Sequence, residues 1–481
     1  MMKLLLIIVE GQLYLASIIA IFVAELALLL WGLWSRRPLI GLLAVFVILP
    51  LMRSTVNAIR ACFITIRVPE GITLGRGEGR GLFELVEGIR VAVGAPPIDS
   101  IVVTGGFDAS AATWRSRWQI RRHRALVLGL PALTTLSLDE LRAVIAHELA
   151  HYASAHDAFA AWVYRTRRSW LELRNALDQR LATPVYVYWL LYWYVPRLDR
   201  AAAEVSRRHE LVADRVAAQI ASSRAAADAL VAFEAGAHFA DCSHWPRIQR
   251  SHETVAEPPR PFAQMLTWNA RTVSHDVLHE ILADHSSPDD THPSMNERFA
   301  RLGLEARLPP PIERSAGAEI LGTELEALAG RLDEGWLTRN GDSWRQHRDQ
   351  YLERRATLDR LAALDRPSPD EQFTRGELAE TLEGGDAALP FYTSAAAAGH
   401  AAAGLAAGRL LLEQMNPAGI TLIEDSMSND DSLVPEGCRI LADYYLQTNQ
   451  ERAARKYERR ARRHKTLARL EQSAQPQAPR H

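Results

Sequence analysis

The longest apolar segment of the chain lies near its N-terminus. Residues 12–34, QLYLASIIAIFVAELALLLWGLW, contain one charged side chain, that of Glu25. As a helix they are long enough to cross a bilayer core of about 30 Å. A shorter apolar segment at residues 38–52 follows a turn that contains two arginines. The pattern predicts a transmembrane hairpin over residues 1–54. The alternatives are a second segment that lies at the membrane interface and a buried hairpin in a soluble protein.

After the predicted hairpin, the pattern changes to that of a globular domain. Residues 62–68 and 98–105 are typical of strands, and an apolar-periodic helix is predicted between them near residues 82–93. Residues 125–136, ALVLGLPALTTL, predict a short strand and a turn. Helical patterns dominate the rest of the chain. We therefore expect a mainly α fold with a small β-sheet.

An aromatic segment, PVYVYWLLYWYVP at residues 184–196, interrupts the helical pattern of residues 158–220. Thirteen helical residues reach only about 20 Å, which is too short to span a bilayer. Tyr and Trp side chains prefer the membrane–water boundary. The segment is therefore expected either at the interface, as an interfacial or re-entrant element, or in the core as an aromatic helix.

The C-terminal region contains a weak repeat. Ala388, Gly419 and Ala453 each precede a larger residue by four positions, and they are 31 and 34 residues apart. Such spacing is typical of tetratricopeptide or Sel1-like helical repeats, with a plain helical bundle as the alternative. The predicted domains after the hairpin are the globular domain (55–310), a helical connector (311–366), the repeats (367–470) and a disordered tail (471–481).

Composition excludes some classes of function. The net charge is −2, so the chain as a whole gives no electrostatic reason to expect nucleic-acid binding. Its three cysteines are far apart, which argues against a disulfide framework or a cysteine-ligated metal. Two basic runs remain. Residues 114–124 are suited to contact anionic lipid headgroups, and residues 452–465 are predicted to be the solvated face of a last helix.

The stretch AVIAHELAHYASAHD at residues 143–157 contains the strongest chemical signal. Ser137, followed three residues later by Glu140, is a capping-box pattern that predicts the start of a helix through these histidines. His147 and His151 then lie one turn apart on one face and can bind one metal, with Glu148 beside them to act on a water molecule. An ordinary amphipathic helix with surface histidines is the alternative, but the neighbouring residues are too apolar for it.

A catalytic zinc normally takes a third protein ligand. His156 lies about 140° further round the helix than His151, which argues against it. Glu210 with Asp214 and Glu280 with Asp284 have the same spacing, in which one carboxylate binds the metal and the other holds a ligand imidazole. Sequence geometry does not separate these two pairs. The remaining candidates are His209, His279 and His292.

Three motifs occur in a characteristic order. They are LSLDELRAVIAHELAHYASAHD at residues 136–157, SRRHELVADRVAA at 206–218 and DDTHPSMNERFARL at 289–302. Together they resemble the zinc helix, the ligand helix and the T-H-P segment of the HtpX-like and CAAX-prenyl-protease family of gluzincin metallopeptidases. The resemblance covers about residues 62–304. It implies an α+β zincin domain that binds one zinc ion per chain.

The resemblance also implies roles for individual residues. The zinc ligands would be His147, His151 and Glu210, and Glu148 would be the general base. His292 and Arg298 would approach from the C-terminal side to stabilise an oxyanion or to gate access.

In one place the chain departs from the family. Members often carry an Asn-Ala pair on the edge strand that aligns the peptide substrate, whereas this chain has Asp108 and Ala109. Pairing of a peptide along that edge remains the expectation. HtpX-like members also have two more spans before the ligand helix, where this chain has only residues 184–196.

These observations predict a membrane-anchored, zinc-dependent endopeptidase that acts on protein or peptide substrates in membrane protein quality control. The repeats would bind a substrate or partner protein. An inactive, membrane-tethered helical-repeat adaptor is the main alternative, and a CAAX-type processing enzyme would need more apolar segments. Arginines after the hairpin outweigh those in its turn, so we expect a multi-pass cell-membrane protein with a cytoplasmic catalytic domain.

Overall fold

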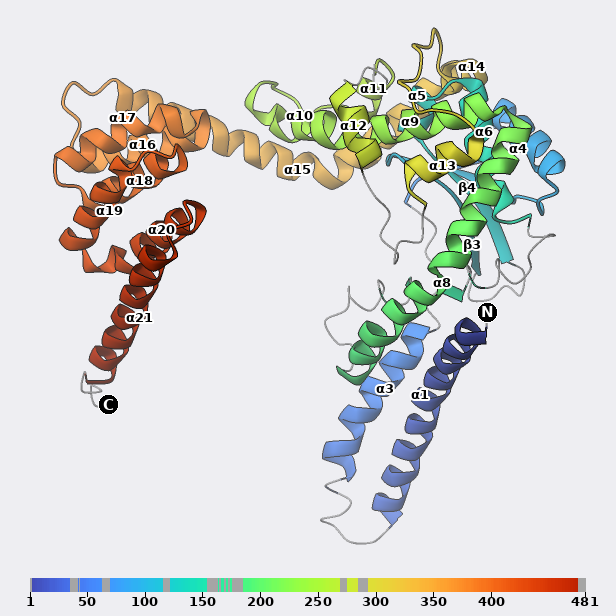
Figure 1. Ribbon diagram of the computed structural model, residues 1–481, viewed down its shortest axis with the longest axis horizontal. Helices are drawn as coiled ribbons and strands as arrows, with labels where there is room; N and C mark the ends of the chain where they lie inside the picture. Colours follow the sequence, from blue (N-terminus) through green and yellow to red (C-terminus); the bar gives the residue numbers. More distant parts are fainter. Residues whose placement is uncertain are drawn as a thin grey trace. The chain divides into compact units, whose positions relative to one another are not determined.

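The computed structural model describes residues 2–34, 42, 44–62, 70–115, 122–153, 163, 166–167, 170–171, 174, 185–268, 275–283 and 293–474. The chain forms two compact units. The first comprises Met1–Arg250 and Pro259–Asn340, and the second comprises Ser251–Pro258 and Gly341–His481. Most described residues are helical, and the strands form a single small sheet (Figure 1). The predicted fold class, mainly α with a small β-sheet, is confirmed.

The first unit contains the sheet and most of the helices. Its elements are α1 (Met2–Trp34), η1 (Ala44–Ile48), α3 (Leu49–Cys62), β1 (Ile72–Leu74), α4 (Arg80–Val93), β2 (Ser100–Thr104), β3 (Ala109–Arg115), β4 (Arg122–Gly129), α5 (Leu130–Thr135), α6 (Leu138–Ala150), α8 (Val185–Ile220), α9 (Ser223–Phe239), η2 (Ala240–His244), α10 (Trp245–Arg250), α11 (Pro261–Met265), α12 (His275–Ala283), α13 (Met295–Leu302), α14 (Ala316–Leu321) and the start of α15 (Thr323–Ala362).

The sheet has the strand order β1-β2-β4-β3, so β3 is an edge strand among the described residues. β2 and β4 are parallel, with Val102 opposite Val127, whereas β1 and β3 run antiparallel to their neighbours. Every residue of β2 is buried. The predicted strand at residues 98–105 and helix at 82–93 are confirmed as β2 and α4. Residues 63–68 of the other predicted strand lie outside the described part of the chain.

Helix α6 begins where the capping box predicts. The Ser137 side chain accepts a hydrogen bond from the Glu140 N–H, and the Glu140 carboxylate accepts one from the Ser137 N–H. Leu141, Ile145 and Leu149 recur at every fourth position and are fully buried against the core. This apolar face fixes the rotation of α6 and thereby the direction in which its histidines point.

Helix α8 is continuous over 36 residues and contains Pro196. Proline has no N–H, so the helical bond to the carbonyl of Tyr192 is missing there, yet the helix continues. Residues 185–196 of the predicted aromatic segment are therefore the first part of α8 and not a separate element. Its Tyr194 is fully buried.

Helix α1 packs against the first part of α8. The Tyr194 hydroxyl donates a hydrogen bond to the Ile7 carbonyl, and a Cβ added to Gly11 would overlap that hydroxyl. Arg197 on α8 donates to the Glu10 carboxylate at 3.0 and 3.2 Å. Glycine at this position thus permits close contact between the helices, and the charge of Glu10 is paired with a residue of α8.

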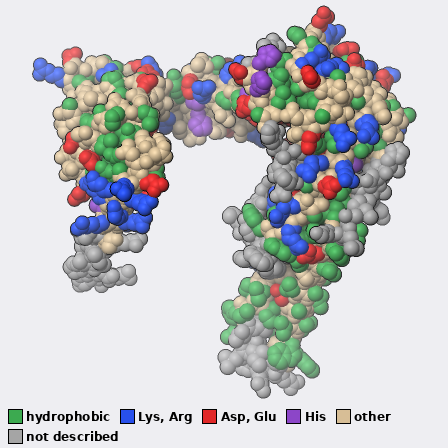
Figure 2. Space-filling model, viewed as in Figure 1, with side chains coloured by type: hydrophobic (Ala, Val, Ile, Leu, Met, Phe, Trp, Pro, Cys, Tyr) green, Lys and Arg blue, Asp and Glu red, His purple; other side chains and the backbone are tan. Residues whose placement is uncertain are grey.

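Of the described helices, α1 alone is long and apolar enough to cross a membrane, over Leu4–Trp34. Many of its large apolar side chains are exposed, as Figure 2 shows. The following segment, η1 with α3, packs against α1, and Thr55 donates a hydrogen bond to Glu25. That this pair forms a transmembrane hairpin stays a prediction.

The second unit consists of helices that pack in successive pairs. Its elements are η3 (Ser251–Glu253), the end of α15, α16 (Pro369–Glu383), α17 (Gly385–Ala397), α18 (Ala401–Glu413), α19 (Ala418–Asn429), η4 (Asp431–Leu433), α20 (Val434–Gln447) and α21 (Glu451–Ala474). Ala388 with Tyr392, and Gly419 with Ile423, are buried on α17 and α19. The pairing is compatible with tetratricopeptide or Sel1-like repeats, which remain a prediction.

Candidate metal centre

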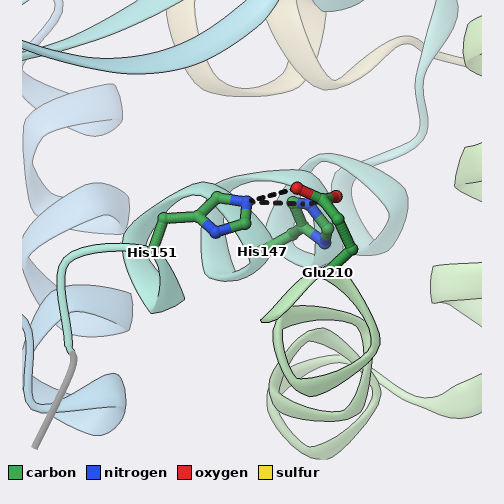
Figure 3. Close-up of side chains that lie close together, drawn as sticks. All are labelled: His147, His151 and Glu210. Atoms are coloured by element: carbon green, nitrogen blue, oxygen red, sulfur yellow. Dashed lines mark hydrogen bonds and ion pairs between the residues drawn. The ribbon is translucent and has the colours of Figure 1, made fainter. Parts of the chain in front are cut away.

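Three potential metal ligands converge from two helices (Figure 3). His147 lies in the last turn of α6, His151 directly follows that helix, and Glu210 lies in the second half of α8. The two Nε2 atoms of the histidines are 3.2 Å apart. Glu210 Oε2 is 3.4 Å from His147 Nε2, and Glu210 Oε1 is 3.6 Å from His151 Nε2.

These separations fit a tetrahedral zinc site. Zinc–ligand distances of about 2.0 to 2.2 Å at a tetrahedral angle place donor atoms about 3.3 to 3.5 Å apart. The three observed separations lie close to that range, with a different Glu210 oxygen facing each histidine. Two imidazoles and one carboxylate are also a donor set of catalytic zinc sites, in which a fourth position stays open. The residues present therefore fit the metal.

The outward nitrogen of His147 is held by a buried ion pair. His147 Nδ1 lies 3.0 Å from Asp214 Oδ1, and Arg298 on α13 donates to both Asp214 oxygens at 2.8 and 2.5 Å. Burial alone would lower the pKa of His147, but hydrogen bonds to Asp214 and Glu210 outweigh it and raise that pKa to about 9. Burial likewise opposes ionisation of Asp214, but Arg298 and His147 lower its pKa to about 2.

His209 has the corresponding place beside His151. The Nδ1 atoms of His151 and His209 are 3.1 Å apart, and His209 is buried. The sequence suggested His209 only as an alternative ligand. In the structure it faces the ring nitrogen of His151 that points away from the other two donors. Each of the two imidazoles thus has a partner on its outward nitrogen, which is how proteins fix the tautomer of metal-binding histidines.

Glu148 on α6 contacts the sheet. Its Oε2 accepts a hydrogen bond of 3.1 Å from the backbone N–H of Ala111 on β3. The side chain is half-buried. An N–H donor directed at a carboxylate stabilises its ionised form. Glu148 is therefore held next to the edge strand by its carboxylate.

Asp108 and Ala109, the predicted substrate-aligning pair, stand at the start of β3. Thr104 Oγ1 donates to Asp108 Oδ1 at 2.5 Å, and the Gly129 N–H donates to the Asp108 carbonyl at 2.7 Å. Burial raises the pKa of the Asp108 carboxyl. The Asp108 side chain therefore holds the backbone that leads into the edge strand. Its role toward a substrate stays a prediction.

Two other candidate ligands, His279 and Glu280, are described and are not part of the group. His279 and Glu280 lie on α12, where Glu280 is exposed. His292, His156 and Asp284 lie outside the described residues. Among the residues that the structure describes, His147, His151 and Glu210 are the group of metal donors whose ligand atoms approach one another closely.

Two histidines one turn apart, a carboxylate from a second helix and an adjacent glutamate are the arrangement of an H-E-x-x-H metallopeptidase centre. Residues 123–306 match the model of peptidase family M48. The matched region contains α6, α8 and α13, and with them every side chain of the cluster. A comparison with curated proteins finds no match. The family match supports a metallopeptidase that acts on protein or peptide substrates.

Proposed function

We propose that the chain is a membrane-anchored zinc endopeptidase that hydrolyses peptide bonds. Its substrates would be unfolded segments of proteins at the membrane, which corresponds to a role in membrane protein quality control. The observation that carries the proposal is the convergence of His147, His151 and Glu210 at zinc-ligand separations. The family match of residues 123–306 supports the peptidase activity. The apolar helix α1 supports the anchor.

The chemistry is divided between the ion and the protein. A zinc ion held by His147, His151 and Glu210 would supply Lewis acidity, which lowers the pKa of a water molecule and polarises a carbonyl group. Glu148 would accept a proton from the attacking water and deliver it to the leaving amine. Its bond from the Ala111 N–H holds the carboxylate in position for both steps.

Two further side chains would position the ligands. Asp214, fixed by Arg298, would hold the Nδ1 proton of His147 and leave Nε2 to bind the metal in place of its own proton. His209 would accept the Nδ1 proton of His151 in the same way. The bidentate contact of Arg298 with Asp214 supports a positioning role for this arginine, in place of the oxyanion or gating role that the resemblance implied.

The edge strand β3 would bind the substrate. β3 has β4 as its neighbour on one side, and its Ala111 N–H points toward Glu148 on the other. An extended peptide that pairs with this edge would bring its backbone beside the general base. Hydrogen bonds between backbones do not depend on the side chains of the substrate. This suits an enzyme that selects unfolded segments.

The test is to measure zinc content and proteolysis of the purified full-length chain. We expect one zinc ion per chain and hydrolysis of casein that is lost with a chelator and restored by zinc. The main alternative is a helical-repeat adaptor with an inactive peptidase fold. One bound zinc without any hydrolysis would support the adaptor, and absence of zinc would refute the metal centre itself.

A further inference from the structure

The last helix, α21, has an unusual concentration of positive charge. Residues Glu451–Lys465 contain eight basic and two acidic side chains, a net charge of +6 in a chain whose net charge is −2. Figure 2 shows Lys and Arg side chains gathered over α21. All eight are exposed: Arg452, Arg455, Lys456, Arg459, Arg460, Arg462, Arg463 and Lys465.

Within Glu451–Thr466, the part of α21 whose side chains are described, the buried residues lie on one side of the helix. Ala454 and Tyr457 are buried and Ala461 is half-buried, and these residues face α20 and its neighbours. The basic side chains occupy the remaining circumference of the helix. The charge therefore lies on a helix that the second unit holds in place, with its basic face directed to solvent.

The arrangement places like charges close together on the helix, and an anion would relieve their repulsion. Four pairs of basic residues stand four positions apart, as Arg455 does from Arg459, and like charges at this spacing repel. The two glutamates of the stretch each pair with one arginine, at 2.6 and 3.7 Å. A merely solvated helix face usually alternates in sign. Six arginines instead favour phosphate groups, which guanidinium binds in a bidentate manner.

We propose that the basic face of α21 binds the phosphate headgroups of an anionic membrane surface. Two observations favour lipid over nucleic acid. The same chain carries the apolar helix α1, so, resting on the anchor proposed above, a bilayer is always near. Surfaces that bind single-stranded nucleic acid add exposed aromatic rings on which bases stack. The aromatic residue among Glu451–Lys465, Tyr457, is buried and stacked on Tyr445.

The contact would keep the second unit beside the bilayer that holds α1. Helices that bind acidic lipids typically carry a cluster of four to eight Lys and Arg residues. The attraction is electrostatic, so it depends on anionic lipid and weakens as salt shortens the Debye length. Anionic lipid would thus decide whether the helical unit lies against the membrane.

The experiment places a fluorophore on a cysteine at the exposed Thr466, after the three native cysteines are replaced by alanine. The full-length protein is reconstituted in vesicles of phosphatidylcholine alone or with phosphatidylglycerol, and quenching by nitroxide-labelled lipid is measured. We expect quenching only with phosphatidylglycerol, and its loss at high salt.

Two triple variants test the surface. Reversal of Arg459, Arg460 and Arg463 to Glu should abolish the quenching without altering the packed face of α21. The matched control is the reversal of three exposed arginines in the same unit with the same change in charge: Arg354, Arg360 and Arg366. In the control, quenching of the label should equal that in wild type.

The outcomes separate the two proposals. Equal quenching in both vesicle types, or equal loss in both variants, would overturn the binding of α21 to anionic lipid. The proposal would also be overturned if the fluorescence of the label at residue 466 changed on addition of single-stranded RNA and not with phosphatidylglycerol. Flotation of wild type with the vesicles tests the anchor separately. If α1 does not anchor the chain, wild type should float only with vesicles that contain phosphatidylglycerol and should dissociate from them at high salt. In that case α21 alone mediates the binding.

Discussion

Glu148→Gln separates the general base from the metal ligands. The amide oxygen of glutamine can accept the same hydrogen bond from the Ala111 N–H, which is 3.1 Å from Glu148 Oε2. The ligand atoms of His147, His151 and Glu210 are not changed. We therefore expect unchanged zinc content and a melting temperature close to that of wild type. Glu148→Ala loses that hydrogen bond as well, so it should cost about 1 kcal/mol of stability.

The rate should respond quite differently from the stability. The amide of glutamine cannot accept the proton of the attacking water, and loss of a general base alone typically costs about 10² to 10⁴ in rate. That loss corresponds to about 3 to 5 kcal/mol in the activation barrier. Zinc content, thermal unfolding and cleavage of casein are measured on both variants. Full zinc with wild-type cleavage in Glu148→Gln would refute the assignment, and loss of zinc would mean that Glu148 is a ligand.

Three further predictions concern the other buried side chains. Glu210→Gln should lower zinc occupancy because an amide is a poorer ligand, whereas Glu280→Gln on the exposed face of α12 should keep it; equal zinc loss would contradict the ligand choice. His209→Leu should weaken zinc binding about 10- to 100-fold in a chelator competition, and His209→Asn, which keeps an acceptor for His151, should weaken it less. Burial lowers the pKa of His244 from 6.5 to about 4. Because the folded-state pKa lies below the unfolded value, stability is full above pH 6.5 and falls by about 2 kcal/mol near pH 5. His244→Gln should therefore lose less melting temperature than wild type on going from neutral pH to about pH 5, and an identical loss would contradict the role of His244.

Local patterns in the sequence predicted the elements that depend on local interactions. The capping box of Ser137 and Glu140 fixes the start of α6, and the four-residue spacing of its buried leucines and isoleucine fixes its rotation. From these alone, His147 and His151 were expected on one face, and the structure brings their Nε2 atoms together. The apolar content of α1 likewise needs no tertiary information.

Contacts between distant residues were not predictable in this way. Arg298 and Asp214 are 84 positions apart, and nothing in the local pattern indicates that they form a bidentate pair. The contact of His209 with His151 depends on the rotamers of both side chains, which the sequence does not indicate. The continuation of α8 through Pro196 depends on packing against α1, which offsets the missing backbone bond. The division into two compact units falls within α15, where the helical pattern shows no boundary.

On the proposal that α1 crosses a bilayer, the continuous helix α8 connects the bilayer to the candidate metal centre. Arg197, which holds Glu10 of α1, is 13 residues before Glu210, a distance of about 20 Å along an uninterrupted helix. If a tilt of α1 rotates α8 by about 5° about Arg197, Glu210 moves by about 2 Å. This displacement is comparable to the length of a zinc–ligand bond. Bilayer thickness, to which a long apolar helix adapts in part by tilting, would therefore adjust the geometry of the zinc ligands. Hydrolysis rates in vesicles of short-chain and long-chain lipid measure this coupling, and equal rates would show that α6 moves together with α8.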